Sequence, residues 1–213
     1  MAAVVAGSLR SRGAVVSAHQ GLNAVASADS QAILHNHSLA LDRHRFGVNY
    51  TPSKNWWFCW NEWDADPIKR DLDAIAALGA DHLRILLIWP YFQPNPKWVS
   101  PLHLERFDQL LTLMGERHLD AVVTAFTGQL SGWFFLPPFN KAGSGFYADA
   151  AIWSAQELFI RELARVMKAK NNIIGFDFGN ETTPAGARSR PWATHGWRKC
   201  SRSWREFLPI TFM

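Results

Sequence analysis

The chain has 213 residues, 48% of them hydrophobic, which is enough for one domain with a sizeable core. Its net charge of +4 belongs to the two ends, because residues 46–181 hold 12 Lys and Arg against 15 Asp and Glu. This distribution argues against nucleic acid as a partner of the central region, and the uncharged stretch 121–140 is broken by two Gly and two Pro, unlike a membrane span.

The first segment, residues 1–44, is rich in Ala, Ser and His and shows no sustained hydrophobic period. We predict a loosely packed or disordered leader there. Ala26-Ser27-Ala28 resembles a signal-peptidase site, but the residues before it are not continuously apolar. The sequence therefore has no clean signal peptide and leaves the compartment open.

Four apolar runs alternate with helical patterns in the next segment, residues 45–181. The runs predict strands over 45–50, 81–89, 120–126 and 173–181. Helices are predicted to begin at Asp66-Pro67, Ser100-Pro101 and Asp149, where a capping side chain opens the pattern, and Gly79 should end the first of them. This order predicts a parallel sheet in an α/β domain. Four strands in about 135 residues make about half of a (β/α)8 TIM barrel.

The last segment, residues 182–213, mixes Arg and Trp without a period of either kind. We predict that it is a tail foreign to the fold, such as a frameshifted end. Two alternatives are a basic amphipathic helix for a membrane surface and an arm that binds nucleic acid.

Polar residues stand at the ends of the predicted strands. Asn180 and Glu181 end the last apolar run, where a (β/α) barrel places its chemistry. Arg84 lies inside an apolar strand and needs a partner if it is buried. His82 shares its face of the strand, and we expect it to be a structural residue with its own partner.

The chain also has eleven Trp, most of them in predicted loops. Flat aromatic rings in loops suit stacking on the apolar face of a ligand such as a sugar. Each could instead be a packing residue. The candidates for binding substrate are the loop and strand-end residues Trp56, Trp57, Trp60, Trp89, Trp133, Asn49 and Tyr50.

Cysteine and metal-ligand patterns indicate no cofactor. Cys59 and Cys200 define no disulfide framework. No cluster of His, Cys and Asp has the spacing of a metal site, and no Gly-rich phosphate motif follows a predicted strand. We therefore expect neither a metal nor an organic cofactor.

Three stretches, Phe46–Tyr50, Leu78–Ile85 and Gly175–Glu181, resemble the retaining glycoside hydrolases of family 5, the cellulase and mannanase type. The resemblance implies a (β/α)8 barrel, a β-linked poly- or oligosaccharide substrate, and secretion. By position it implies that Glu181 is the general acid/base, that Asn180 binds the sugar hydroxyl next to the reacting carbon, and that Arg84 steadies the nucleophile.

The retaining mechanism needs a second carboxyl group about 5–5.5 Å from the first. The family places it at the end of strand seven, which this sequence does not reach. Asp177 lies roughly 13 Å from Glu181 along an extended strand, and Glu206 lies in no predicted strand. We expect a truncated hydrolase with little or no activity. The alternative is a non-catalytic carbohydrate-binding fragment. An open half barrel also predicts self-association through its sheet edges.

Overall fold

The computed structural model describes residues 44–127, 129–131, 133–140 and 149–180. The predicted tail, Glu181 and all of the predicted leader except His44 lie outside the described residues. Among the described residues, no helix is long and apolar enough to cross a membrane.

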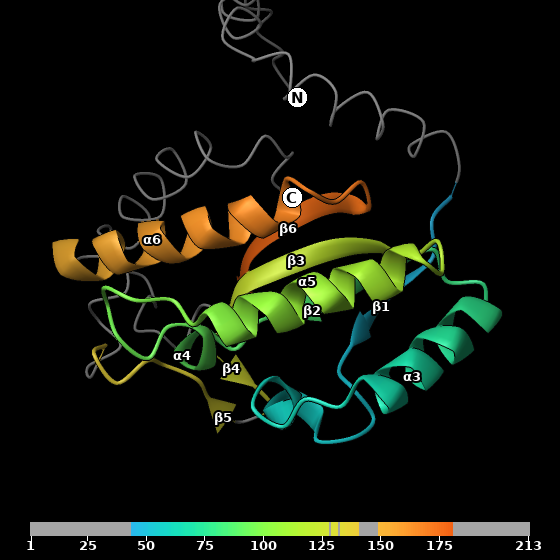
Figure 1. The fold of residues 1–213 in the computed structure, drawn as a ribbon, viewed down its shortest axis with the longest axis horizontal. Coiled ribbons are helices and arrows are strands. Elements are labelled where there is room, and N and C mark those ends of the chain that lie inside the picture. Colours follow the sequence, from blue (N-terminus) through green and yellow to red (C-terminus); the bar gives the residue numbers. More distant parts are fainter. Residues whose placement is uncertain (1–43, 128, 132, 141–148, 181–213) are drawn as a thin grey trace, which may run out of the picture.

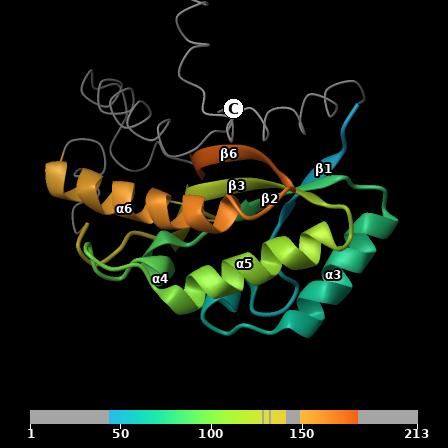
Figure 2. The ribbon, with the colours of Figure 1, turned by 45° about the horizontal axis from the view of Figure 1, so that its top comes forward.

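A four-stranded parallel sheet forms the centre of the fold. Its strands are β1 (Gly47–Tyr50), β2 (His82–Leu86), β3 (Asp120–Thr127) and β6 (Ile173–Asn180), in the spatial order β1-β2-β3-β6. The three main helices are α3 (Ala65–Ala77), α5 (Pro101–Gly115) and α6 (Ala150–Met167), and they cover one face of the sheet (Figures 1 and 2). The predicted order of alternating strands and helices is confirmed. This is the arrangement of the first four βα units of a TIM barrel.

The helix starts follow from local capping chemistry. Ser100 accepts from the backbone N–H of His103 at the start of α5, and Asp149 accepts from two N–H groups at the start of α6, as predicted. The predicted cap at Asp66 is wrong by two residues. Asp64 is the cap, because its carboxylate accepts from the Asp66 N–H at 3.2 Å and so takes the first free donor of α3.

The connections after the strands contain more structure than the sequence predicted. The loop after β1 holds a 3-10 helix, η2 (Trp56–Trp60), and the predicted second strand ends three residues early, before the single-turn helix α4 (Trp89–Phe92). The loop after β3 contains an antiparallel pair, β4 (Gln129–Leu130) and β5 (Trp133–Phe134). These segments lie on the side of the sheet where the strands end.

The core lies between the sheet and the helices. Apolar stripes on the helices pack there, with Ile68 and Leu72 from α3, Phe107, Leu111 and Met114 from α5, and Ile152, Phe159 and Leu163 from α6. Strand β3 is buried along almost its whole length, as expected for a central parallel strand.

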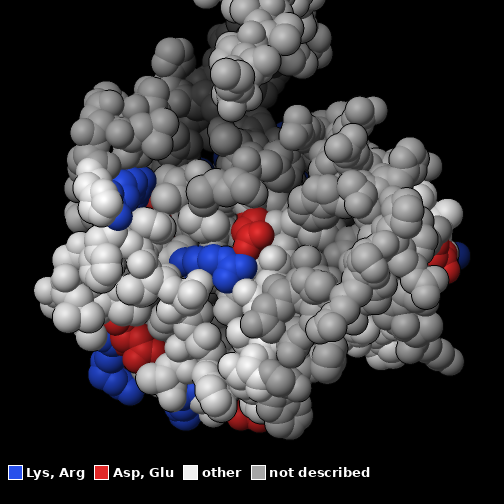
Figure 3. Space-filling view, turned by 180° about the vertical axis from the view of Figure 1, so that it is seen from behind, with Lys and Arg blue, Asp and Glu red and all other residues white. Residues whose placement is uncertain are grey.

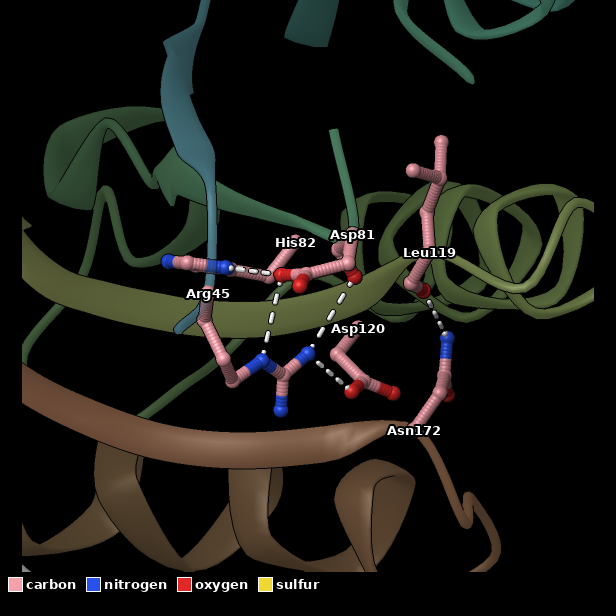
Figure 4. Close-up of polar contacts among 6 residues, drawn as sticks. All are labelled: Arg45, Asp81, His82, Leu119, Asp120 and Asn172. Carbon is pink, nitrogen blue, oxygen red and sulfur yellow. Dashed lines mark hydrogen bonds and ion pairs between the residues drawn. The ribbon is translucent and has the colours of Figure 1, made fainter. Parts of the chain in front are cut away.

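An ion-pair network closes the amino-terminal end of the sheet (Figure 4). Arg45 precedes β1 and donates to Asp81 Oδ1 at 3.1 Å and to Asp120 Oδ2 at 2.5 Å, so that it joins the starts of three strands. His82 Nδ1 lies 2.6 Å from the same Asp81 oxygen. As predicted, His82 is held by a protein partner.

Candidate active site

Arg84 lies at the centre of the sheet face opposite the helices. Its neighbours Leu83 and Ile85 are buried in the core. Because side chains alternate along a strand, Arg84 takes the other face. Seen from that side, basic and acidic side chains touch near the middle of the face, and the other charged groups lie toward its edge (Figure 3).

Asp177 is the main partner of Arg84. Arg84 Nε donates to Asp177 Oδ2 at 2.8 Å, and Nη2 donates to the same oxygen. Thr124 Oγ1 also donates to this oxygen at 3.0 Å, and the Gly179 N–H donates to Oδ1 at 3.4 Å. Each side chain of the ion pair is 27% exposed. Asp177 is therefore an acceptor held by four donors, which is unlike a free catalytic acid.

The other edge of the guanidinium reaches two amides. Arg84 Nη1 donates to Asn180 Oδ1 at 3.1 Å and to Asn49 Oδ1 at 3.3 Å. With Thr124 and Asp177, the cluster draws on all four strands of the sheet. The structure thus brings together three residues that the sequence predicted, namely Arg84, Asn180 and Asn49.

Two members of this cluster were missed as site residues. The sequence indicated Asp177 only as a second acid that lies too far from Glu181, and it predicted no role for Thr124. Each is a polar residue in an apolar strand, which is a weak but usable signal that a partner lies on the same face.

Two candidate residues lie beyond what the structure describes. Glu181 follows the last described residue of β6, and the side chain of Trp133 in β5 is not among the described ones. Their roles stay predictions.

Three of the tryptophan candidates are packing residues in this structure. Trp57, Trp60 and Trp89 are 4%, 3% and 1% exposed. Trp60 donates to the Leu86 carbonyl at 3.1 Å, and Trp89 donates to Gln93 Oε1 at 2.7 Å. Their rings face protein, so we do not include them in a ligand surface.

Tyr50 is also turned into the core. Its hydroxyl donates to Asp71 Oδ2 on α3 at 3.1 Å. Burial and the nearby Asp71 carboxylate raise the pKa of Tyr50 well above its usual value. Tyr50 therefore ties β1 to α3 on the side away from Arg84.

Trp56 is the exposed exception, with 55% of its surface accessible. Its ring stacks on Trp57, with centroids 4.2 Å apart, and the backbone of Asn55 and Trp56 has positive φ, which is uncommon for a bulky residue. Beside the ring lies an open hollow of about 440 Å³, lined by Thr51, Pro52, Ser53, Asn55, Trp56 and Phe58. An exposed ring next to polar groups is a surface on which a sugar can stack.

The described residues offer no metal centre. Among them, no group of three or more His, Cys, Asp and Glu is placed to hold a metal ion. The cluster around Arg84 offers hydrogen bonding and charge stabilisation by Arg84 and its amide neighbours.

No protein-family model matches the sequence, and no curated protein matches it. Solved structures do match. A GH5_18 protein from Streptomyces cattleya in complex with GlcNAc is 33% identical, with a TM-score of 0.73, over 79% of this chain and 43% of that one. Another structure of GH5_18 from that organism holds Manβ1-4GlcNAc.

Two further structures agree. A GH5_18 protein from Bifidobacterium longum subsp. longum is 31% identical, with a TM-score of 0.70, over 76% of this chain and 40% of that one. The exo-β-1,4-mannosidase Op5Man5 from Opitutaceae bacterium strain TAV5 is 30% identical, with a TM-score of 0.72, over 78% of this chain and 30% of that one. The chain thus spans less than half the length of these proteins. The four parallel βα units match the amino-terminal part of their TIM barrels.

Proposed function

We propose that this chain, which has the fold of the amino-terminal part of a glycoside hydrolase family 5 barrel, contributes half of a retaining active site for β-linked mannosides. The observation that carries the proposal is the bond from Arg84 to Asn180, the residue before Glu181. It lies where the strands end, which is where barrel enzymes react with substrate. The similarity to GH5_18 proteins and to an exo-β-mannosidase supports a mannoside rather than a cellulose chain.

The proposed roles follow from the chemistry of retaining hydrolysis. Glu181 would protonate the leaving-group oxygen and then take a proton from the attacking water. Asn180 would bind the hydroxyl next to the reacting carbon. Arg84 has five N–H donors, and its bonds to Asp177, Asn49 and Asn180 use four of them within the described part of the chain. The fifth donor is suited to a nucleophilic carboxylate.

That carboxylate is not found at this rim among the described residues. Asp177 is occupied by Arg84, Thr124 and the Gly179 N–H. Retaining cleavage needs both carboxyl groups, so we propose that these 213 residues alone bind a β-mannoside and cleave it little or not at all.

A binding measurement tests the proposal. Calorimetric titration with Manβ1-4GlcNAc should show binding that is tighter than binding of cellobiose, and Arg84→Ala should weaken it about tenfold or more, because a charged anchor of the site is lost. Absence of binding to any β-linked disaccharide would refute the proposed site. Turnover of an aryl β-mannoside that Glu181→Gln abolishes would support the hydrolase and refute the expected inactivity.

A second candidate is a carbohydrate-binding fragment without catalysis, which the exposed Trp56 beside its hollow favours. Under this alternative, Trp56→Ala would abolish sugar binding and Arg84→Ala would leave it unchanged. The same titration therefore separates the two functions.

We also propose self-association through the edge strands β1 and β6, which pair on one side only within the described sheet. Light scattering should show a mass that rises with concentration. A monomer at all concentrations would contradict this part of the proposal.

A further inference from the structure

The Asp177 carboxylate is more fully bonded than an ordinary ion pair requires. Oδ2 accepts from Arg84 Nε, from Arg84 Nη2 and from Thr124 Oγ1, while Oδ1 accepts from the Gly179 N–H. A carboxylate offers about four lone-pair sites. Asp177 therefore uses its acceptor capacity within the protein, and its position is fixed from two other strands and from its own backbone.

The ion pair also crosses the sheet instead of joining neighbours. Arg84 lies on β2 and Asp177 on β6, and β3 runs between them. Strands lie about 4.8 Å apart, so the side chains of Arg84 and Asp177 together span roughly 10 Å of the open face. The register of the three strands is already set by their backbone pairing. Asp177 is thus not needed to align them.

Fixing one edge of a guanidinium fixes the other, because the group is planar and rigid. With Nε and Nη2 held on Asp177, Nη1 is directed at Asn180 and Asn49. Within a side-chain amide, only the oxygen can accept a guanidinium N–H, because the NH2 group is a donor. The Asn180 amide must therefore turn Oδ1 toward Arg84, which places its NH2 group on the opposite side of the amide.

We propose that Asp177 is a positioning residue. It holds Arg84 so that Arg84 orients the Asn180 amide, with Oδ1 toward the guanidinium and the NH2 group on the side from which a sugar hydroxyl oxygen would approach. This inference rests on the proposed function, because it assigns Asn180 to the sugar. An amide in the opposite orientation would present a carbonyl oxygen, which can accept from the hydroxyl but cannot donate to it.

Asp177→Asn is the main test, because it removes the charge and keeps the shape. Asp120→Asn is the matched control, since Asp120 is also a partly buried carboxylate paired with an arginine, at the other end of the sheet. The first readout needs no ligand and uses the NMR signals of the Arg84 Nε–H and the Asn180 side-chain amide. Both should shift and exchange faster in Asp177→Asn and stay unchanged in Asp120→Asn.

The second readout is the Kd for Manβ1-4GlcNAc. We expect about a tenfold weakening in Asp177→Asn, as for one lost charge-assisted bond, and no change in Asp120→Asn. Thr124→Val removes a single donor to Asp177 and should weaken binding in the same direction by about twofold to threefold. This variant serves if Asp177→Asn does not fold.

The outcomes separate the two claims. If the unaltered chain does not bind the disaccharide, the proposed function fails, while the NMR readout still decides whether Asp177 orients Arg84 and Asn180. If Asp177→Asn leaves both signals in place, or if Asp120→Asn weakens binding equally, the positioning role is overturned and the ion pair is structural.

Discussion

The two ends of the sheet carry arginine–carboxylate networks that use the same chemistry for different purposes. At the amino-terminal end, Arg45 contacts two carboxylates and the Asp81 carbonyl, which lies 3.3 Å from Nη2. At the carboxyl end, Arg84 has one carboxylate and reaches two side-chain amides. The partners of Arg45 are residues at the starts of strands, whereas the amide partners of Arg84 can also hydrogen-bond a ligand.

Under the proposed function, the difference separates an end that supports stability from an end that supports binding. Burial alone would raise the pKa of Asp81, but hydrogen bonds from His82 and Arg45 outweigh it and hold the pKa below its usual value. Such a carboxylate stabilises the fold at neutral pH. Changes at this end should therefore lower stability and leave ligand affinity unaltered, and changes near Arg84 should do the reverse.

Of the changes that compare the two ends of the sheet, the one at Gly47 is expected to have the largest effect. A Cβ there would lie 2.2 Å from His82 Nε2, so Gly47→Ala must displace the ring and disturb its contact with Asp81. We expect a loss of about 3 kcal/mol in the free energy of unfolding, as for an overpacked core site, measured by urea denaturation. The control Gly115→Ala meets its nearest atom at 3.4 Å and should change stability by less than about 1 kcal/mol. Equal losses in the two variants would contradict the account.

Arg84→Lys tests the other end. Lysine keeps the charge but has no planar fork, so it cannot hold Asp177 and the two amides together. We expect about a tenfold weaker Kd for Manβ1-4GlcNAc, or about 1.4 kcal/mol, with a change in unfolding free energy of less than about 1 kcal/mol. If Arg84→Lys bound the disaccharide normally but lost stability, the carboxyl end would support the fold and not binding, which would contradict the account.

Acidification should loosen the two ends in different pH ranges. His103 joins α5 to the loop after β1, with Nδ1 2.8 Å from Ser100 Oγ and Nε2 2.9 Å from Asn61 Oδ1. Burial, with a smaller effect of Arg106, lowers the pKa of His103 to about 4. The unfolded chain takes up this proton near pH 6.5, so the stabilising contribution of neutral His103 is complete above that pH and is lost as pH falls toward 4.

Asp81 loses its stabilising contribution at a lower pH than His103 does. Its folded pKa is lowered, so its stabilising contribution is present above the usual pKa of about 3.9 and is lost below it. Hydrogen exchange followed by mass spectrometry from pH 7 to 3.5 should show protection lost first around η2 and the start of α5. His103→Gln should remove this early loss. Simultaneous loss at both ends would contradict the prediction.

The smallest effect is expected at Trp56. Its ring is mostly exposed, so Trp56→Ala should leave the unfolding free energy within about 0.5 kcal/mol. If Trp56 lies at the edge of the sugar site, the Kd should weaken by about twofold to fivefold. Trp57→Ala is the buried counterpart and should cost about 3–5 kcal/mol. Quenching of Trp fluorescence by the disaccharide measures the change in Kd.

Local chemistry explains what the sequence predicted well. Ser100 and Asp149 cap helices through contacts within three residues, and Gly79 ends α3 with a φ of +83°. Apolar runs that alternate with helical patterns were enough to predict four parallel strands. Arg84 and Asn180 were placed in one site by their strand ends and by the family resemblance, and the structure joins them.

Contacts between distant segments explain what the sequence missed. The pairing of Arg84 with Asp177 crosses a strand and links residues 93 apart, so distance along the chain gave no sign of it. The tryptophans of the loop after β1 looked alike in the sequence, but η2 turns Trp57 and Trp60 inward and leaves Trp56 outside. Only the packing of that turn against the sheet and Phe135 makes the distinction.

We propose that the carboxyl end of the sheet, through Arg84 and its amides, forms a sugar-binding surface, whereas the amino-terminal network only stabilises the fold. An NMR titration of the chain with Manβ1-4GlcNAc tests it most directly. We expect shifts at Asn49, Arg84 and Asn180 and none at Arg45 or Asp81. Shifts confined to the amino-terminal network, or no shifts at millimolar disaccharide, would contradict it.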